Sequence, residues 1–141
     1  MRIAVIDGQG GGMGKAIVEK LRLEFGEDID IIALGTNALA AALMIKAGAN
    51  EGASGENAIV FSSSKVDVII GPIGIIAANS MLGELTPLMA KAIAESPARK
   101  ILIPMNRCNI LIAGARSEPL PHQVDNAVEI LKAIIRGEKN V

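Results

Sequence analysis

The chain has 141 residues, a formal net charge of -1 and 50% hydrophobic residues. This length suits a single domain spanning residues 1–141 and suffices to bury a core. The near-neutral charge, without a basic cluster, argues against a nucleic-acid partner. One cysteine excludes an internal disulfide, and no apolar run reaches the roughly 20 residues of a membrane span. We therefore expect a cytoplasmic protein that binds neither nucleic acid nor membrane.

An apolar segment, residues 2–7, is predicted to be a strand that runs directly into a cluster of glycines. The cluster comprises Gly8, Gln9, Gly10, Gly11, Gly12, Met13 and Gly14. Glycines permit a sharp turn and leave room for a ligand's phosphates, and a following helix N-terminus offers free N–H groups to an anion. We interpret the cluster as a turn that binds a nucleotide or another phosphate-containing ligand. The alternative is that its glycines serve only tight turning and close packing.

The glycine cluster also ends in Gly14-Lys15, as the phosphate loop of nucleoside-triphosphate hydrolases does. However, Ala16 stands where a Ser or Thr hydroxyl would hold magnesium, and Gln9 stands where the first glycine would be. Such a hydrolase is therefore disfavoured. No spacing of His, Cys, Asp and Glu predicts a metal site.

The first half of the chain alternates predicted helices and strands. Apolar residues at four-residue spacing indicate a helix over 13–25, and an apolar run indicates a strand over 29–34 that is covered on both faces. Asn37 is predicted to cap a helix running from Ala38 to Ala47. As far as Ile45 this helix is apolar all round, so we expect it to be the contact of a homo-oligomer.

The middle of the chain is less clearly patterned. We expect a flexible loop over 48–54 and a short helix over about 55–63, capped by Ser54, before a strand over 66–70. A helix is preferred to a strand at 55–63 because a parallel crossover to the next strand needs a dozen or more residues.

The remaining predicted elements are a short helical piece ending near Leu82, a helix from Thr86-Pro87 to Glu95, strands over 100–105 and 110–114, and a C-terminal helix ending before Gly137. The link 106–109 is too short for a parallel return. The strand over 110–114 should therefore pair antiparallel with its predecessor at a sheet edge.

Right-handed crossovers place the strands that begin at Ile29, Arg2, Val66 and Lys100 side by side in that order. The predicted fold class is α/β, a three-layer Rossmann-like fold with a mainly parallel sheet and an antiparallel edge strand near the C-terminus. The strand order reverses between the second and third of these strands, and ligands of open α/β sheets bind at such a switch. The predicted crevice separates the glycine cluster from a second turn, formed by Gly71, Pro72, Ile73 and Gly74.

The end of the second strand, where an NAD-binding protein carries an Asp or Glu for the ribose hydroxyls, has the sequence Gly35-Thr36-Asn37. The missing carboxylate disfavours NAD, and the lack of a nearby Arg or Lys disfavours a 2′-phosphate. Thr36 and Asn37 could hydrogen-bond a ribose, although a role of Asn37 as a helix cap alone is favoured. NAD(P) is therefore a candidate cofactor with neither form preferred.

Candidate catalytic groups are few. Asp7 could orient the glycine cluster or act as a base, although a carboxylate beside a phosphate would repel it. His122 is expected in a surface turn, and Cys108 lacks a neighbouring base that would activate its thiol. The sequence assigns no catalytic residue.

The segment Val5-Ile-Asp-Gly-Gln-Gly-Gly-Gly-Met-Gly14 closely resembles the nucleotide-binding turn of dihydrodipicolinate reductases, which has the order Gly-x-Gly-Gly-x-Met-Gly. The resemblance implies that Gly8, Gly10, Gly11, Met13 and Gly14 line the pyrophosphate site of NAD(P). Those reductases also carry a histidine-rich catalytic segment in a second domain, whereas this chain has one histidine.

Over its full length the chain resembles an uncharacterised bacterial family of short Rossmann-like proteins, with similar segments at 71–76 and 79–87. That family implies the fold and no reaction. Three hypotheses remain open: a nucleotide-binding module without catalysis, a small oxidoreductase whose active site is completed across an oligomer interface, and a structural or interaction protein without a cofactor.

Overall fold

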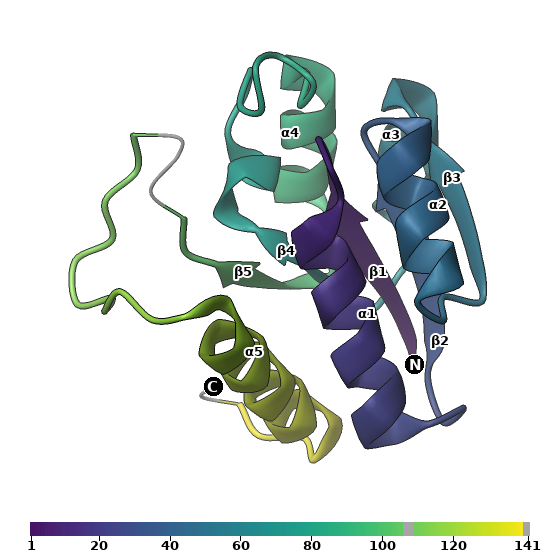
Figure 1. Cartoon of the computed structure of the whole chain (residues 1–141), viewed down its shortest axis with the longest axis vertical. Helices are drawn as coiled ribbons and strands as arrows, with labels where there is room; N and C mark the ends of the chain where they lie inside the picture. Colours follow the sequence, from purple (N-terminus) through teal and green to yellow (C-terminus); the bar gives the residue numbers. More distant parts are fainter. Residues whose placement is uncertain (106–108, 140–141) are drawn as a thin grey trace.

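A computed structural model describes residues 1–105 and 109–139 as a sheet between two layers of helices (Figure 1). The elements in chain order are β1 (Arg2–Asp7), α1 (Gly12–Phe25), β2 (Asp30–Gly35), α2 (Ala38–Lys46), β3 (Glu51–Ser54), α3 (Glu56–Ser62), β4 (Val68–Pro72), the 3-10 helix η1 (Ile73–Ile76), α4 (Pro87–Glu95), β5 (Arg99–Ile103) and α5 (Leu120–Ile135). No helix of the described residues is long and apolar enough to cross a membrane.

The five strands form one parallel sheet in the order β3-β2-β1-β4-β5. The predicted α/β class and the predicted order of the four main strands are confirmed. In this order the chain moves to one side of β1 with β2 and β3 and to the other side with β4 and β5. The switch therefore lies at the carboxyl ends of β1 and β4, where Asp7 and Pro72 end their strands.

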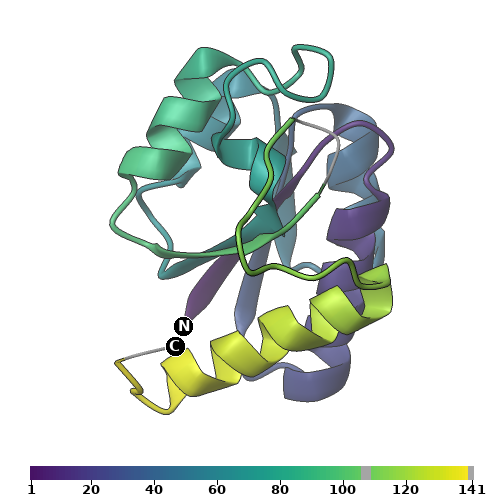
Figure 2. The same cartoon turned by 90° about the vertical axis from the view of Figure 1, so that its left-hand side faces the viewer.

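Alternate side chains of each strand enter two separate cores because successive strand residues point to opposite faces. In β1, Ile3 and Val5 pack with buried residues of α1, α2 and α5, whereas Ala4 and Ile6 pack with buried residues of α3, η1 and α4. Two views of the fold show α1 and α5 together on one side of the sheet and α4 on the other (Figures 1 and 2). Both faces are covered, which explains the unbroken apolar runs of β1 and β2.

The predicted antiparallel edge strand over 110–114 is wrong. The sheet ends at β5, all strands are parallel, and residues 110–114 are irregular with a turn at 113–114. Leu111 is 89% exposed, so this apolar run is not buried as a strand in the sheet. Pro104, which has no N–H to donate, follows the last residue of β5.

The predicted flexible loop over 48–54 is also wrong, since residues 51–54 form β3 at the opposite edge of the sheet. A Cβ on Gly52 would lie 2.7 Å from Ile45 Cδ1, so α2 packs closely over this strand. The short helix predicted at about 55–63 is confirmed as α3. Its cap is not Ser54 as predicted, because Gly55 is the N-cap residue and makes no side-chain hydrogen bond.

The predicted helix cap at Asn37 is confirmed by a hydrogen bond, and Thr86 caps the helix predicted to begin at Thr86-Pro87. The Ala40 N–H donates to Asn37 Oδ1 over 2.9 Å between N and O, and the Met89 N–H donates to Thr86 Oγ1 over 3.2 Å. The helical piece predicted to end near Leu82 is shorter than expected. It stops at Ile76, and turns fill the segment 78–84.

Two glycines in the first turn of α1 differ sharply in their surroundings. A Cβ on Gly14 would lie 2.5 Å from Met44 Sδ and 2.8 Å from Asp7 Cβ, whereas a Cβ on Gly12 would meet no described atom within 4 Å. Close approach of α1 to β1 and α2 therefore depends on Gly14.

We predict that Gly14→Ala lowers the free energy of unfolding by about 1–3 kcal/mol, as overpacking of a filled core does. Gly12→Ala is the matched control and should leave stability unchanged or slightly higher, because alanine favours helix. Urea denaturation of both variants measures the difference. Equal stability of the two variants would contradict the packing role of Gly14.

Candidate functional site

The glycine turn, residues 8–14, is held by the carboxylate of Asp7. The Gly8 N–H donates to Asp7 Oδ1 (N···O 2.8 Å) and the Gly14 N–H donates to Asp7 Oδ2 (N···O 2.6 Å). A backbone hydrogen bond from Gly11 N to Gly8 O, 2.9 Å, closes the turn, and Gly11 adopts a φ of 75° that favours glycine. Asp7 therefore joins the end of β1 to the start of α1.

The buried Asp7 side chain is 5% exposed. Burial has the largest effect on the pKa of Asp7 and raises it above the ordinary value. The hydrogen bonds from the N–H groups of Gly14 and Gly8 lower this pKa, and the one from Gly14 has the larger effect of the two. The negative charge of Glu84 adds to the rise. Both Asp7 oxygens are occupied by the turn, so this residue is suited to orienting the turn.

One face of the glycine turn is packed and the other is open. A Cβ on Gly8 would collide with the Thr36 hydroxyl, and one on Gly11 would lie 2.8 Å from Ala40 Cα. By contrast, a Cβ on Gly10 or Gly12 would meet no described atom within 4 Å. The open face thus lies over Gly10 and Gly12.

Three N–H groups of the turn are free to bind a ligand. Among the described residues, the hydrogen bonds include none donated by the backbone N–H of Gly10, Gly12 or Met13. These groups lie in or next to the first turn of α1, where the helix dipole favours an anion.

The predicted second turn lies across the switch from Asp7. A cavity of about 360 Å³ is lined by Asp7, Gln9, Pro72, Gly74, Ser80, Met81, Leu82 and Met105. Gly71 is buried within β4, where a Cβ would collide with the Ile6 carbonyl oxygen. Ile73 begins η1 and does not line this cavity. The structure therefore brings Pro72 and Gly74 to the crevice and uses Gly71 for close packing.

A carboxylate that the sequence did not predict reaches the end of β2. Glu84 Oε1 accepts hydrogen bonds from Thr36 Oγ1 (2.7 Å), Asn37 Nδ2 (2.7 Å) and the Gln9 backbone N–H (3.0 Å). Glu84, from the segment between η1 and α4, thus links Thr36 and Asn37 to the glycine turn, and Asn37 Nδ2 also donates directly to the Gln9 carbonyl oxygen over 3.0 Å. No local sequence pattern indicates that Glu84 belongs to the site, because only tertiary folding brings this residue to the end of β2.

Hydrogen bonds from Thr36, then from Asn37, hold the pKa of Glu84 below its ordinary value of 4.5. The Gln9 N–H lowers this pKa further, while desolvation opposes the shift. The group is therefore ionised at neutral pH. Glu84 takes part in none of the ion pairs among the described residues, so its charge is balanced by polar donors.

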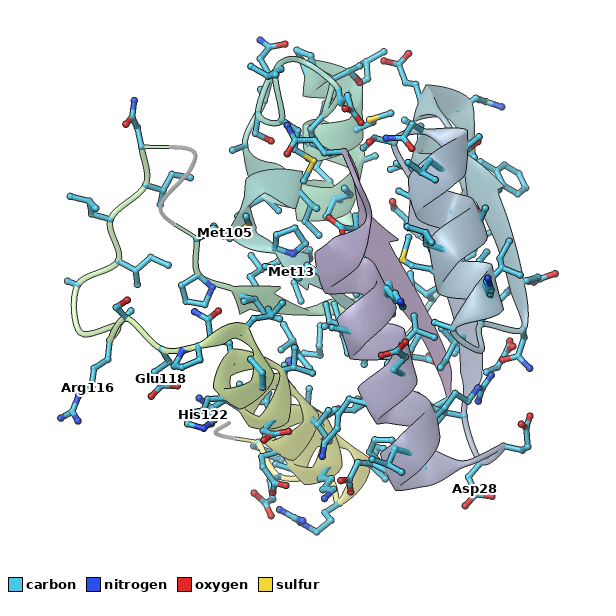
Figure 3. All side chains as sticks on the ribbon, in the orientation of Figure 1. Met13, Asp28, Met105, Arg116, Glu118 and His122 are labelled. Carbon is cyan, nitrogen blue, oxygen red and sulfur yellow. The ribbon has the colours of Figure 1, made fainter. Side chains whose placement is uncertain are left out.

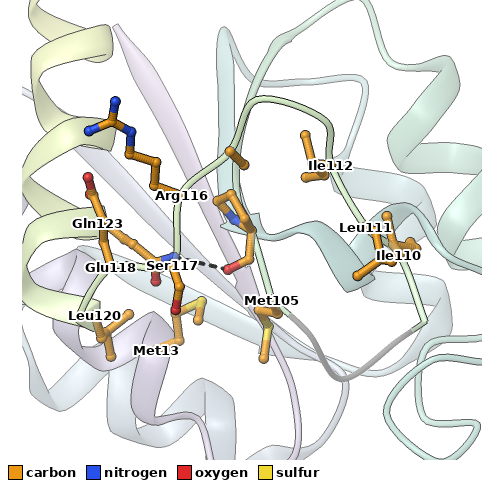
Figure 4. A pocket seen from close by; sticks show the side chains of 12 residues that line it. Met13, Met105, Ile110, Leu111, Ile112, Arg116, Ser117, Glu118, Leu120 and Gln123 are labelled. Carbon is orange, nitrogen blue, oxygen red and sulfur yellow. Dashed lines mark hydrogen bonds between the residues drawn. The ribbon is translucent and has the colours of Figure 1, made fainter.

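A second cavity, of about 500 Å³, is drawn in Figure 4. Met105 lines both cavities, and Met13 of α1 lines the second. Its wall includes apolar residues of the segment 110–115 and polar Arg116, while the Gln123 amide closes one side by donating to the Pro104 carbonyl oxygen over 3.3 Å. The glycine turn therefore lies between the two cavities: Gln9 lines the first cavity and Met13 lines the second.

His122, another candidate catalytic residue, does not join this site. His122 is exposed near the start of α5 (Figure 3), and Cys108 lies outside the described residues. No group of three or more His, Cys, Asp or Glu side chains that could hold a metal ion is found in the described ranges.

The sequence matches the family described as "Domain of unknown function (DUF3842)" over residues 2–136. The chain belongs to this family. The match confirms the resemblance to a family of unknown function. A comparison with curated proteins finds no match.

Two solved structures are similar to this DUF3842 chain in fold. Apo saccharopine dehydrogenase (L-Glu forming) from Saccharomyces cerevisiae matches with a TM-score of 0.48 and 12% identity, over 90% of this chain and 24% of that one. A dodecameric FMN-dependent UbiX-like decarboxylase from Escherichia coli O157:H7 matches with a TM-score of 0.49 and 16% identity, over 94% of this chain and 76% of that one. This chain thus spans about a quarter of the dehydrogenase.

The lowered pKa of Glu84 predicts a specific dependence of stability on pH. A carboxyl whose pKa is lowered by folding stabilises the protein above its ordinary pKa of 4.5, and this contribution is lost as pH falls through the folded value. Glu84→Gln should therefore be less stable than the wild type at pH 7, and the difference should shrink below pH 4.5. Urea denaturation across this range measures it. A difference that does not change with pH would show that the ionised carboxylate adds nothing to the fold.

Proposed function

We propose that this protein binds a nucleotide or a similar phosphate-containing ligand, with NAD(P) as the candidate, at the glycine turn. The observation that carries the proposal is the open face of the turn, where three N–H groups lack acceptors among the described residues and no side chain intrudes. A phosphate oxygen accepts such donors, and the dipole of α1 favours its charge. Gly10, Gly12 and Met13 would hold the phosphate.

The two carboxylates near the turn are compatible with an anion on its open face. Asp7 is buried and directs both oxygens to Gly8 and Gly14, while Glu84 lies toward the end of β2. The backbone N–H of Gln9 donates a hydrogen bond to Glu84. The turn therefore has one side occupied by internal acceptors and another side available to a ligand.

The surroundings of the turn suit a ligand larger than a phosphate ion. The cavity between Asp7 and Pro72 and the adjoining cavity beside Met13 together border the turn on both sides. In open α/β sheets, ligands occupy the crevice at the strand switch, which here runs between β1 and β4. One part of a dinucleotide could lie toward β2 and the other beyond β4.

We favour a binding module over an enzyme. In the cavity between Asp7 and Pro72, Asp7 is the one titratable side chain among the described lining residues, and the turn engages both its oxygens. An oxidoreductase completed by a second subunit is the alternative proposal. A second copy would then have to add an acid or base to this crevice.

Binding at the turn predicts ligand-dependent stabilisation that Gly10→Val abolishes. A ligand at 100 times its Kd stabilises a folded protein by about 2.7 kcal/mol, which raises the melting temperature by several degrees. The probes are NAD, NADP, ATP, FMN and S-adenosylmethionine in thermal-shift and calorimetric titrations.

Gly10→Val should fold as the wild type does because its side chain meets open space, while its bulk covers the free N–H groups. Gly10→Ala is the graded control and should weaken binding less. Failure of every probe to stabilise the wild type would refute the proposal. Undiminished stabilisation of Gly10→Val would place the ligand elsewhere.

We also propose that α2 is the contact of a homo-oligomer. Its inner residues Ala40, Ala41 and Met44 are buried, whereas Leu39 is 59% exposed on its outer side and Ile45, whose tip packs over Gly52 of β3, is 43% exposed at the edge of that side. Ala42 is exposed between them, so the three residues form an apolar stripe at three-residue spacing. Burial of this stripe against a second copy would remove apolar surface from water.

Light scattering coupled to size exclusion tests the oligomer proposal. The wild type should be a dimer or larger, and Leu39→Glu should shift it toward the monomer. Leu23→Glu changes an exposed leucine of α1, 77% exposed, and serves as the matched control without effect on assembly. A monomeric wild type at high micromolar concentration would contradict the proposal.

A further inference from the structure

The segment between η1 and α4 places the carboxylate of Glu84 at the end of β2, where the sequence of β2 and its following loop has no acidic residue. The end of β2 has Gly35, Thr36 and Asn37, without an acid. Glu84 Oε1 lies within hydrogen-bond distance of the Thr36 hydroxyl, the Asn37 amide and the Gln9 N–H. Three donors from two different loops therefore converge on one oxygen.

The segment that carries Glu84 is built as a folded turn. The Asn79 N–H donates to Leu85 O (2.8 Å), and the Glu84 N–H donates to Met81 O (3.1 Å). The Ser80 hydroxyl donates to the Gly74 carbonyl oxygen, and the fully buried Leu85 anchors the segment in the core beneath α4. Glu84 is thus held at the end of β2 by the structure around it.

The second oxygen of Glu84 is available to a ligand. Every hydrogen bond that Glu84 accepts among the described residues goes to Oε1, and none goes to Oε2. The side chain is half-buried, and Oε2 is not among the buried atoms without a partner. The residue can therefore accept hydroxyl donors from a ligand without giving up its internal contacts.

We propose that Glu84 is the acceptor for the two ribose hydroxyls of a nucleotide bound at the glycine turn, so that the ligand class is one with an unmodified 2′,3′-diol. This inference rests on the proposed binding of a nucleotide at that turn. A carboxylate beside the glycine turn at the end of the second strand accepts a ribose 2′-hydroxyl in dinucleotide-binding folds. In this chain Glu84, from the segment that follows β4, provides the carboxylate at that position.

The same geometry disfavours a ligand with a 2′-phosphate. A phosphate placed at Glu84 would meet an ionised carboxylate. No Lys or Arg of the described residues pairs with Glu84 or donates to Thr36 or Asn37. NAD should therefore bind in preference to NADP.

Calorimetric titration of NAD and NADP into the wild type and into Glu84→Gln tests this inference. We expect the wild type to bind NAD at least about tenfold more tightly than NADP, because a hydrogen bond to a charged group is the stronger kind. Glu84→Gln should lose about tenfold in NAD affinity while NADP affinity holds or rises. Glu95→Gln, on the exposed end of α4, is the charge-matched control and should keep the wild-type preference.

The outcomes separate this inference from the proposal on which it rests. If neither dinucleotide nor any other nucleotide binds, both are overturned. If NAD and NADP bind equally to the wild type, the turn binds nucleotides but Glu84 is not the ribose acceptor. If Glu84→Gln binds both NAD and NADP more tightly than the wild type does, the wild-type carboxylate competes with the ligand for the donors of the site, which also overturns the inference. The wild-type preference is measurable even if the variant fails to fold.

Discussion

The hydrogen bonds from Gly8 and Gly14 to the buried carboxylate of Asp7 determine the shape of the site. They join the last residue of β1 to the first turn of α1 and so define the path of the glycine turn. The other glycine contacts follow from this path, because Gly14 brings α1 against Met44 and Gly8 leaves no space beside Thr36. With the inner face of the turn occupied in this way, its free N–H groups are those of Gly10, Gly12 and Met13 among the described residues. The packing that stabilises the turn thereby leaves one face for a ligand.

Glu84 extends this arrangement across the strand switch. Its Oε1 connects Gln9 of the turn with Thr36 and Asn37 at the end of β2, although it belongs to the segment that follows β4. Three loops at the carboxyl edge of the sheet are therefore tied together by one oxygen. The negative charge is stabilised by polar donors, which lower its pKa, and the fold keeps a half-buried carboxylate beside a turn suited to phosphate. This combination favours a ligand with both a phosphate and hydroxyl groups.

Elements whose structure follows from local pattern could be predicted from the sequence, and elements that depend on tertiary contacts could not. The caps at Asn37 and Thr86 and the covered strands β1 and β2 follow from local residue types. The segment Glu51–Ser54 lacks β-branched residues and is a strand because β2 and α2 hold it, whereas the apolar run at 110–114 has strand-like composition but no sheet partner. For the site, the glycine turn could be found from its spacing. Glu84 could not, since its distance from Thr36 along the chain carries no information about their contact.

The central claim is that the open face of the glycine turn and the free oxygen of Glu84 form one nucleotide site. Amide chemical-shift mapping with ADP-ribose tests it most directly, because this probe carries the phosphates and the unmodified adenosine ribose without a nicotinamide. The account predicts saturable shifts that are largest at the amides of Gly10, Gly12 and Met13 and extend to Glu84 and Thr36. Shifts confined to other parts of the chain, or none at saturating concentration, would contradict it.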